Sequence, residues 1–299
     1  MEFVDNMLKR FDGDSELRKA VNALVCFSSP ETGKKLAQLA FQVAMTRSEG
    51  SSLALLYFIE GQQESLPQEE ISRIQSTIST DFTPKTEKEK ITLRTFISDK
   101  TDHTAQIEKL IEELGSNLLI RGINANELNI GLVEQYSLLR RDPANPVQTI
   151  LTQFPGKQAE ILQELTAMMS SNKVPTALFV DNDMQEPHRI FLPLLCRSDI
   201  HLFTYLYHLA LLEQTEIMVW DAIGIIETES KLQKLYQFIV KKSDGKVRQW
   251  DNDRKIEKSF IQSQDLIMMG VEGWSRLTNT PLSWKEQLPS LLIIKDIKR

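Results

Sequence analysis

Short apolar runs alternate with amphipathic stretches along the chain. Residues 22–27 form an apolar run with strand character, and residues 53–59 form a second run that is apolar on both faces. Between these runs, Leu36, Leu39 and Val43 recur at spacings of three and four residues, which is typical of a helix with one apolar face. The pattern predicts a strand, a helix and a second strand, with both strands buried in a parallel sheet.

The same alternation continues to about residue 184. A polar stretch over residues 123–156, rich in Asn and Pro, interrupts it and is interpreted as an irregular insertion. Ser29, directly before Pro and Glu, is a helix-start signal, because its hydroxyl can accept a hydrogen bond from the amides of the first turn. Further strands are expected at residues 91–97, 118–120 and 176–180, and further helices at 67–79, 103–114 and 157–170.

A shorter version of this order follows from residue 188 onwards. The sequence therefore predicts an α/β protein with two tandem doubly wound parallel-sheet domains, one over residues 20–184 and one over 188–299, after a lead-in at 1–19. Cys26 and Cys196 are expected to occupy the same place in the two copies. Strands are predicted at residues 190–195, 217–220, 246–250, 266–269 and 291–294, and helices at 199–212, 230–240, 254–264 and 283–288.

Ligands of doubly wound folds bind outside the carboxyl ends of the strands, where the strand order reverses. Four segments follow predicted strands and are the candidate ligand-binding loops. They are residues 28–30 and 122–126 in the first copy and residues 197–199 and 270–274 in the second.

The charge and cysteine content of the chain exclude several classes of protein. The 299 residues include 35 Lys and Arg and 41 Asp and Glu, a net charge of −6, so no overall excess of positive charge is present to bind a nucleic acid backbone or to dock on an anionic membrane. The two cysteines, each at the end of an apolar run, predict buried reduced thiols rather than a disulfide framework. The apolar runs are too short to span a bilayer, and the acidic N-terminus does not resemble a secretory signal.

The strand sequences resemble a known domain family. Leu-Val-Cys-Phe-Ser-Ser-Pro-Glu at residues 24–31, Leu-Leu-Ile-Arg-Gly at 118–122 and the order of elements are similar to the universal stress protein domain, here in tandem. The resemblance extends over about residues 20–299. It implies a Rossmann-like fold of the adenine nucleotide alpha hydrolase type.

A narrower resemblance concerns membrane transporters. Leu-Lys-Arg-Phe-Asp at residues 8–12, Ala-Leu-Phe-Val-Asp-Asn at 177–182 and Arg-Ile-Phe-Leu-Pro-Leu-Leu at 189–195 resemble the cytoplasmic C-terminal region of Kef-type sodium/proton (cation/proton) antiporters. The resemblance implies a non-catalytic regulatory or interaction domain at the inner face of the membrane, covalently linked to a membrane transporter domain. A homodimer is a further expected partner arrangement, and nucleic acid is not expected as a partner.

Nucleotide-binding members of the resembled family carry Gly-x-x-Gly after the fourth strand, followed nine residues on by Gly and Ser or Thr. In the first copy Gly122 is followed by Ala125, so the pattern is lost there. In the second copy Gly270 and Gly273 match the first half, while Ser283 stands in place of the later glycine. These three residues, Gly270, Gly273 and Ser283, are the candidate ligand-binding set, and ATP or AMP is the ligand they would take.

Two alternatives to a regulatory domain stay open. The first is a free-standing tandem universal stress protein that binds ATP or another adenine nucleotide through the Gly270 turn. The second is an enzyme such as a hydrolase, for which the sequence offers only scattered residues: His103, Asp221, and a pair, His201 and His208, too far apart along a helix to share one zinc ion. No nucleophile, base and orienting group occur together, so we expect no catalytic residues, no metal site and no resident cofactor.

Overall fold

In the computed structural model, the chain folds into two compact units. The first unit contains residues 20–45, 49–181 and 295–299, and the second is built mainly of residues 182–294. The structure describes residues 20–45, 50–59, 69, 71–73, 76, 91–98, 103–124, 169, 173–212, 214–279 and 288–297.

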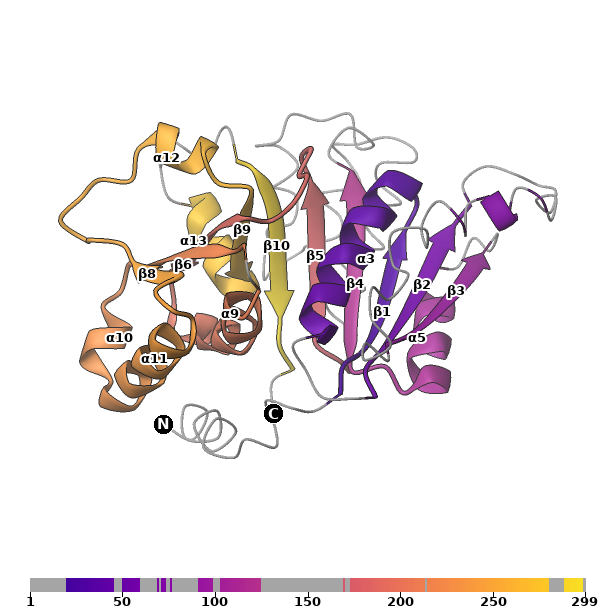
Figure 1. Ribbon diagram of the computed structural model, residues 1–299, viewed down its shortest axis with the longest axis horizontal. Coiled ribbons are helices and arrows are strands. Elements are labelled where there is room, and N and C mark those ends of the chain that lie inside the picture. The colour runs from indigo at the N-terminus through magenta and orange to yellow at the C-terminus, as the bar shows by residue number, and fades with distance from the viewer. Residues whose placement is uncertain are drawn as a thin grey trace. The chain divides into compact units, whose positions relative to one another are not determined.

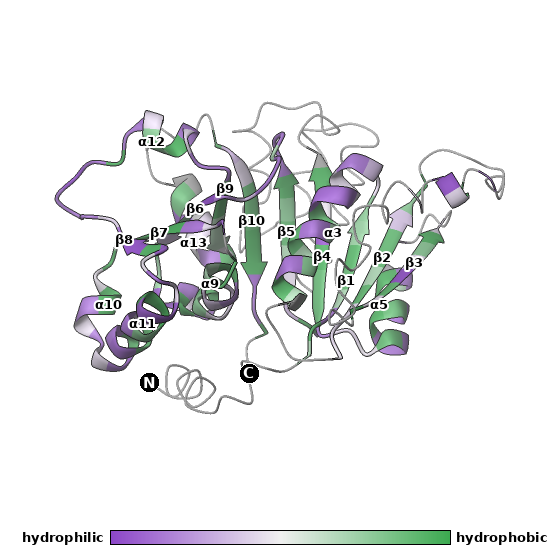
Figure 2. Ribbon diagram, viewed as in Figure 1, coloured by the Kyte–Doolittle hydropathy of each residue, from purple (hydrophilic) through white to green (hydrophobic). Residues whose placement is uncertain are grey.

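The first unit contains a parallel sheet with strand order β3-β2-β1-β4-β5. β3 ends the order and is the most exposed of its strands, whereas β1 and β5 are buried along nearly their whole length. Figure 1 shows α3 in front of this sheet and Figure 2 shows its strands as apolar. The elements are β1 (Asn22–Phe27), α3 (Pro30–Met45), β2 (Ser52–Phe58), β3 (Thr92–Ser98), α5 (His103–Leu114), β4 (Leu118–Asn124) and β5 (Thr176–Asp181).

The second unit repeats the same strand order with its own elements. Its parallel strands follow the order β8-β7-β6-β9-β10, so the first strand in sequence is central and the third is at one end, as in the first unit. The elements are β6 (Arg189–Leu194), a 3-10 helix η3 (Arg197–His201), α9 (Leu202–Ala210), β7 (Glu216–Asp221), α10 (Ile225–Thr228), α11 (Ser230–Lys242), β8 (Val247–Gln249), α12 (Lys258–Gln262), β9 (Leu266–Gly270), α13 (Val271–Asn279) and β10 (Ser290–Lys295).

In each unit the strands have the order typical of doubly wound nucleotide-binding folds, three-two-one-four-five in order along the chain. The predicted α/β fold class, with a doubly wound parallel strand order in each unit, is confirmed. Nearly all predicted strands that fall on described residues match an observed strand to within one or two residues. The main extension is β4, which continues to Asn124, so Gly122 lies inside a strand and not in a loop.

Three predictions in the second unit are wrong in detail. Residues 270–274, expected to form a loop, are the last residue of β9 and the first turn of α13. The helix predicted at 254–264 is reduced to Lys258–Gln262, because the residues before it are mostly exposed and polar. Cys26 lies within β1 while Cys196 lies beyond the end of β6, so the two cysteines do not occupy matching positions.

The helices predicted at 157–170 and 283–288 and the insertion at 123–156 lie largely outside the described residues. The helix predicted at 67–79 is described only at residues 69, 71–73 and 76, which are helical.

Candidate functional site

The carboxyl ends of β6 and β9 meet at one edge of the second unit's sheet. Residues 195–199 follow β6 and turn into η3, and α13 begins directly after Gly270 at the end of β9. This edge contains the candidate glycines Gly270 and Gly273, and Trp274 is buried beside them in α13. It is the place where the strand order reverses, and ligands of such folds bind there.

The side chain at the centre of this edge is Asp199, which is fully buried. Its Oδ2 accepts hydrogen bonds from the backbone amides of Leu195, at 2.9 Å, and Cys196, at 3.0 Å. Its Oδ1 has no hydrogen-bond partner among the described residues. The carboxyl group therefore closes the turn between β6 and η3 and keeps one oxygen unsatisfied.

Burial raises the pKa of the Asp199 carboxyl, although the amide of Leu195, the thiol and amide of Cys196 and the nearby His201 ring act to lower it. A raised pKa favours the neutral acid.

The two glycines face this carboxyl group. A Cβ atom on Gly270 would overlap Oδ1 of Asp199 and lie 3.0 Å from Cε1 of His201. A Cβ atom on Gly273 would lie 2.5 Å from Oδ2 and 2.9 Å from Oδ1 of Asp199. Glycine is needed at both positions because the Asp199 carboxyl group occupies the space of a side chain.

An anion approaching Gly270 and Gly273 from that side would therefore meet a carboxyl group. Glu272, between the two glycines, adds a second acidic side chain in the same turn. Ser283, the third residue of the predicted ligand-binding set, lies outside the described residues. The structure thus gives the glycine pair a packing role, and ligand binding by the set stays a prediction.

His201 belongs to the same cluster. Its Nδ1 lies 2.6 Å from the carbonyl oxygen of Ser198, which can only accept, so Nδ1 carries the proton and the ring's Nε2 is an acceptor when the ring is neutral. Nε2 is buried and has no hydrogen-bond partner among the described residues. The two histidines singled out in the sequence lie in different helices. His201 is the last residue of η3, and His208 is buried further along the chain in α9.

The thiol of Cys196 lies beside Ser198 in a buried environment. Its Sγ lies 3.0 Å from Oγ of Ser198, and burial raises the pKa of the thiol, which favours the unreactive protonated form. Cys26 and Cys196 are both buried and neither is in a disulfide, as the sequence predicts. No group of three or more His, Cys, Asp or Glu side chains suited to a metal ion occurs among the described residues.

Asp221, a candidate by its position at a strand end, is a helix cap. Its Oδ1 accepts from the amide of Ile225 at 2.9 Å and its Oδ2 from the amide of Ile226 at 2.7 Å. The fully buried carboxylate thus satisfies two amides of α10, a helix that the sequence pattern does not reveal.

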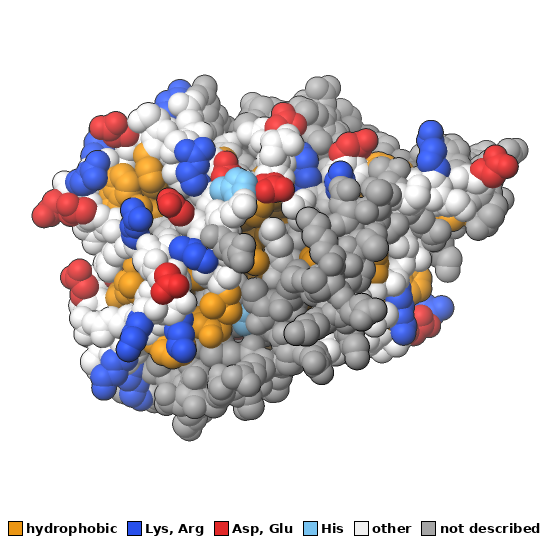
Figure 3. All heavy atoms as spheres, in the orientation of Figure 1, with side chains coloured by type: hydrophobic (Ala, Val, Ile, Leu, Met, Phe, Trp, Pro, Cys, Tyr) orange, Lys and Arg blue, Asp and Glu red, His pale blue; other side chains and the backbone are white. Residues whose placement is uncertain are grey.

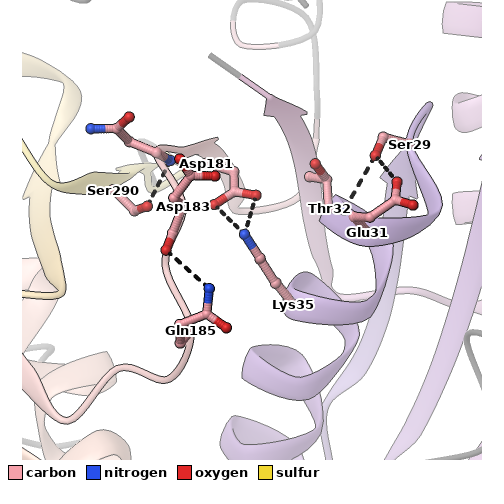
Figure 4. A network of polar contacts seen from close by, with 9 residues as sticks. Ser29, Glu31, Thr32, Lys35, Asp181, Asp183, Gln185 and Ser290 are labelled. Carbon is pink, nitrogen blue, oxygen red and sulfur yellow. Dashed lines mark hydrogen bonds and ion pairs between the residues drawn. The ribbon is translucent and has the colours of Figure 1, made fainter. Parts of the chain in front are cut away.

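The equivalent edge of the first unit contains an ion pair that sequence reasoning misses. Figure 4 shows Lys35, on α3, reaching the carboxylate of Asp181 at the end of β5, with Nζ–O distances of 2.8 and 3.1 Å. The Asp181 side chain is fully buried and that of Lys35 is 19% exposed. Both residues lie at the carboxyl end of the sheet, which is the only sequence signal that could have paired them.

The start of α3 behaves as the sequence predicts. Oγ of Ser29 accepts from the amide of Thr32 at 3.4 Å and donates to the Glu31 carboxylate at 2.8 Å (Figure 4). Gly122, in β4, permits close packing of this helix, because a Cβ atom there would overlap Leu36 and lie 2.9 Å from Cγ2 of Thr32. Gly122 is therefore a packing residue and its placement in a ligand-binding loop is wrong.

An aromatic and cationic stack lies on another part of the first unit. The Arg121 guanidinium lies 4.7 Å from the centre of the Phe58 ring, which in turn stacks on His103 at 3.9 Å between ring centres. Arg121 is 2% exposed, so a buried cation is held partly by an aromatic face. His103 thus has a packing role at the start of α5.

Among the described residues, no helix has the length and apolar character needed to cross a membrane.

Comparison with known proteins gives structural neighbours only. No protein-family profile matches the chain, and no curated protein sequence matches it. A universal stress protein from Archaeoglobus fulgidus aligns over 94% of this chain and 98% of its own, with 11% identity and a TM-score of 0.45. UDP-GlcNAc 2-epimerase from Neisseria meningitidis aligns over 83% and 77%, with 7% identity and a TM-score of 0.21. Both scores are low, and the fold assignment rests on the strand order and register described above.

Proposed function

We propose that the chain is a non-catalytic regulatory or interaction module, and that it is the part outside the membrane of a cation/proton antiporter. The observation that supports the first half is the packing of Asp199 against Gly270 and Gly273. In a nucleotide-binding protein of this fold, backbone amides at such a turn hold phosphate groups. Here the protein's own carboxyl group fills one side of that turn.

The chemistry of the remaining groups agrees with a non-catalytic role. Burial raises the pKa of the Cys196 thiol, and the Asp221 carboxylate is used as a helix cap. Nδ1 of His201 donates a hydrogen bond to the carbonyl oxygen of Ser198 within η3. Cys196, His201 and Asp221 thus each make a local structural contact.

The antiporter link is supported by the resemblance of residues 8–12, 177–182 and 189–195 to the cytoplasmic region of such transporters. In this proposal a transporter domain is covalently attached, and the two α/β units lie at the inner face of the membrane. A regulatory module of this kind would act by changing its contacts with the attached domain.

Calorimetric titration with ATP and with AMP tests the choice between a regulatory module and a nucleotide-binding protein. We expect no saturable heat from either nucleotide, because the carboxyl group of Asp199 and the carboxylate of Glu272 face or flank the glycine turn. Saturable binding that is lost in a Gly273→Asp protein shown by circular dichroism to be folded, and kept in Gln233→Asp on the exposed side of α11, would establish the ATP-binding alternative.

The reading frame around the codon for Met1 tests the antiporter link separately. We expect it to continue upstream into a segment that encodes several membrane-spanning helices. An in-frame stop codon immediately upstream would remove this half of the proposal and leave the regulatory module as a free-standing protein.

A further inference from the structure

Helix α11 in the second unit presents a cationic face. Its 13 residues include Lys231, Lys234, Lys241 and Lys242 and no acidic side chain. All four lysines are exposed, whereas Leu232, Leu235, Tyr236 and Ile239 are buried. In a chain with a net charge of −6, this helix is a local concentration of positive charge.

The lysines lie on one side of the helix. At 3.6 residues per turn, the four lysines and Phe238 fall within an arc of about 100° around the axis, and Lys231 and Lys242 are about 16 Å apart along it. We call these five residues the lysine face. Figure 3 shows Lys and Arg side chains gathered over α11, with hydrophobic side chains beside them.

An exposed aromatic ring lies among these charges. Phe238 is 39% exposed, and Nζ of Lys242 lies 5.9 Å from the centre of its ring. The ring also stacks on Tyr207 of α9, at 6.0 Å between ring centres. Leu211, one helical turn after Tyr207, is 38% exposed. The lysine face therefore borders apolar surface that water covers in the isolated chain.

The acidic residues at the ends of α11 only partly offset its charge. Glu229, directly before the helix, is paired with Arg197 at 2.7 Å. Asp244, just after the helix, is exposed, and Lys246 and Arg248 follow it closely in the chain. The local balance remains positive.

We propose that the lysine face binds the surface of an anionic phospholipid membrane. Lysines attract a diffuse layer of headgroup phosphates without fixed geometry, whereas recognition of one phosphate or carboxylate group usually relies on the paired donors of arginine. The cations of the lysine face are all lysines. An exposed aromatic side chain between cationic ones is the arrangement with which amphipathic helices lie at a lipid interface.

This inference goes beyond the proposed function and does not depend on it, because the chain alone can be tested. The full chain is mixed with vesicles of phosphatidylcholine and phosphatidylglycerol in equal parts, and separately with vesicles of phosphatidylcholine, and bound protein is measured by sedimentation. We expect binding to the anionic vesicles only, weakened by added salt.

Two charge-matched variants locate the surface. Each lysine at an anionic membrane contributes about a fivefold gain in binding, so Lys234→Gln/Lys241→Gln is expected to bind about 25-fold more weakly. Lys255→Gln/Lys258→Gln removes the same charge from exposed positions outside α11 and is expected to bind like the unaltered chain. Phe238→Ser is expected to weaken binding without altering the salt dependence.

Three results would overturn the proposal. They are no binding to anionic vesicles, equal loss in the two double variants, and binding to polyglutamate in place of vesicles, which would indicate an acidic protein partner. A failure here leaves the nucleotide titration and the reading-frame test unaffected, because neither involves the lysine face.

Discussion

Asp199 is the residue that most affects the functional interpretation, because its side chain packs against the glycine pair. A glycine pair after the fourth strand of such a sheet predicts a phosphate turn, and sequence alone cannot tell which atoms lie opposite the glycines. The structure places a buried carboxyl group there, with two backbone amides on one oxygen and none on the other. Residues 197–199 stand out in the sequence as a candidate loop, but nothing in their pattern shows that Asp199 points inward.

Asp199→Asn is expected to change how stability depends on pH. Because burial raises the pKa of this carboxyl above its unfolded value of 3.8, the native state holds the proton more tightly. The free energy of unfolding therefore falls as pH rises from the unfolded pKa through the raised native pKa. Each tenfold difference in proton affinity corresponds to about 1.4 kcal/mol.

Asparagine keeps the shape of the neutral acid and does not titrate. The free energy of unfolding of Asp199→Asn should therefore not decrease over this pH range, and the variant should be more stable than the unaltered chain at neutral pH. Urea unfolding of both proteins from acidic to neutral pH measures the difference. Parallel stability profiles for the two proteins would show that the Asp199 proton is not coupled to folding.

At the element scale, α3 shows how local signals fix an element and long-range contacts complete it. Ser29 caps the helix as its sequence predicts, and the apolar residues at spacings of three and four, Leu36, Leu39 and Val43, are buried. The ion pair between Lys35 and Asp181 joins positions far apart in the sequence, so no local pattern could reveal it.

Lys35→Met is expected to destabilise the chain by about 3 kcal/mol, because it leaves the buried Asp181 carboxylate without its cation. Lys173→Met, at an exposed position of the first unit, is the control and should change the free energy of unfolding by less than about 0.5 kcal/mol. Denaturant unfolding measures both. Similar small effects from the two substitutions would mean that Asp181 is adequately solvated without Lys35.

Helix α13 shows where the sequence pattern is misleading. Two glycines in four residues favour a turn over a helix, yet the helix begins directly after Gly270. Trp274 and Leu277, three residues apart, are both buried and stabilise it by packing. That spacing is the signal that could have identified the helix, and tertiary packing outweighs the low helix propensity of Gly273.

At the scale of the whole molecule, the sequence predicts the fold better than the site. The apolar runs at residues 22–27, 53–59 and 266–269 become buried strands, because a parallel sheet covered on both faces needs continuous apolar sequence. The properties of the candidate site in the second unit depend on which side chain packs against Gly270 and Gly273. That side chain is Asp199, and the sequence pattern does not reveal it. The two units share a strand order while the carboxyl ends of their strands differ: Lys35 and Asp181 meet in one, and Asp199 meets the glycines in the other.

Gly270 and Gly273 make room for the Asp199 carboxyl group. A double-mutant cycle with Gly273→Ala and Asp199→Ala measures this coupling through the free energy of unfolding. We expect Gly273→Ala to be strongly destabilising alone, because its Cβ would lie 2.5 Å from Oδ2, and the double variant to be more stable than the sum of the single effects by about 1 to 3 kcal/mol. Additive effects of the two substitutions would show that the glycines and Asp199 do not depend on one another.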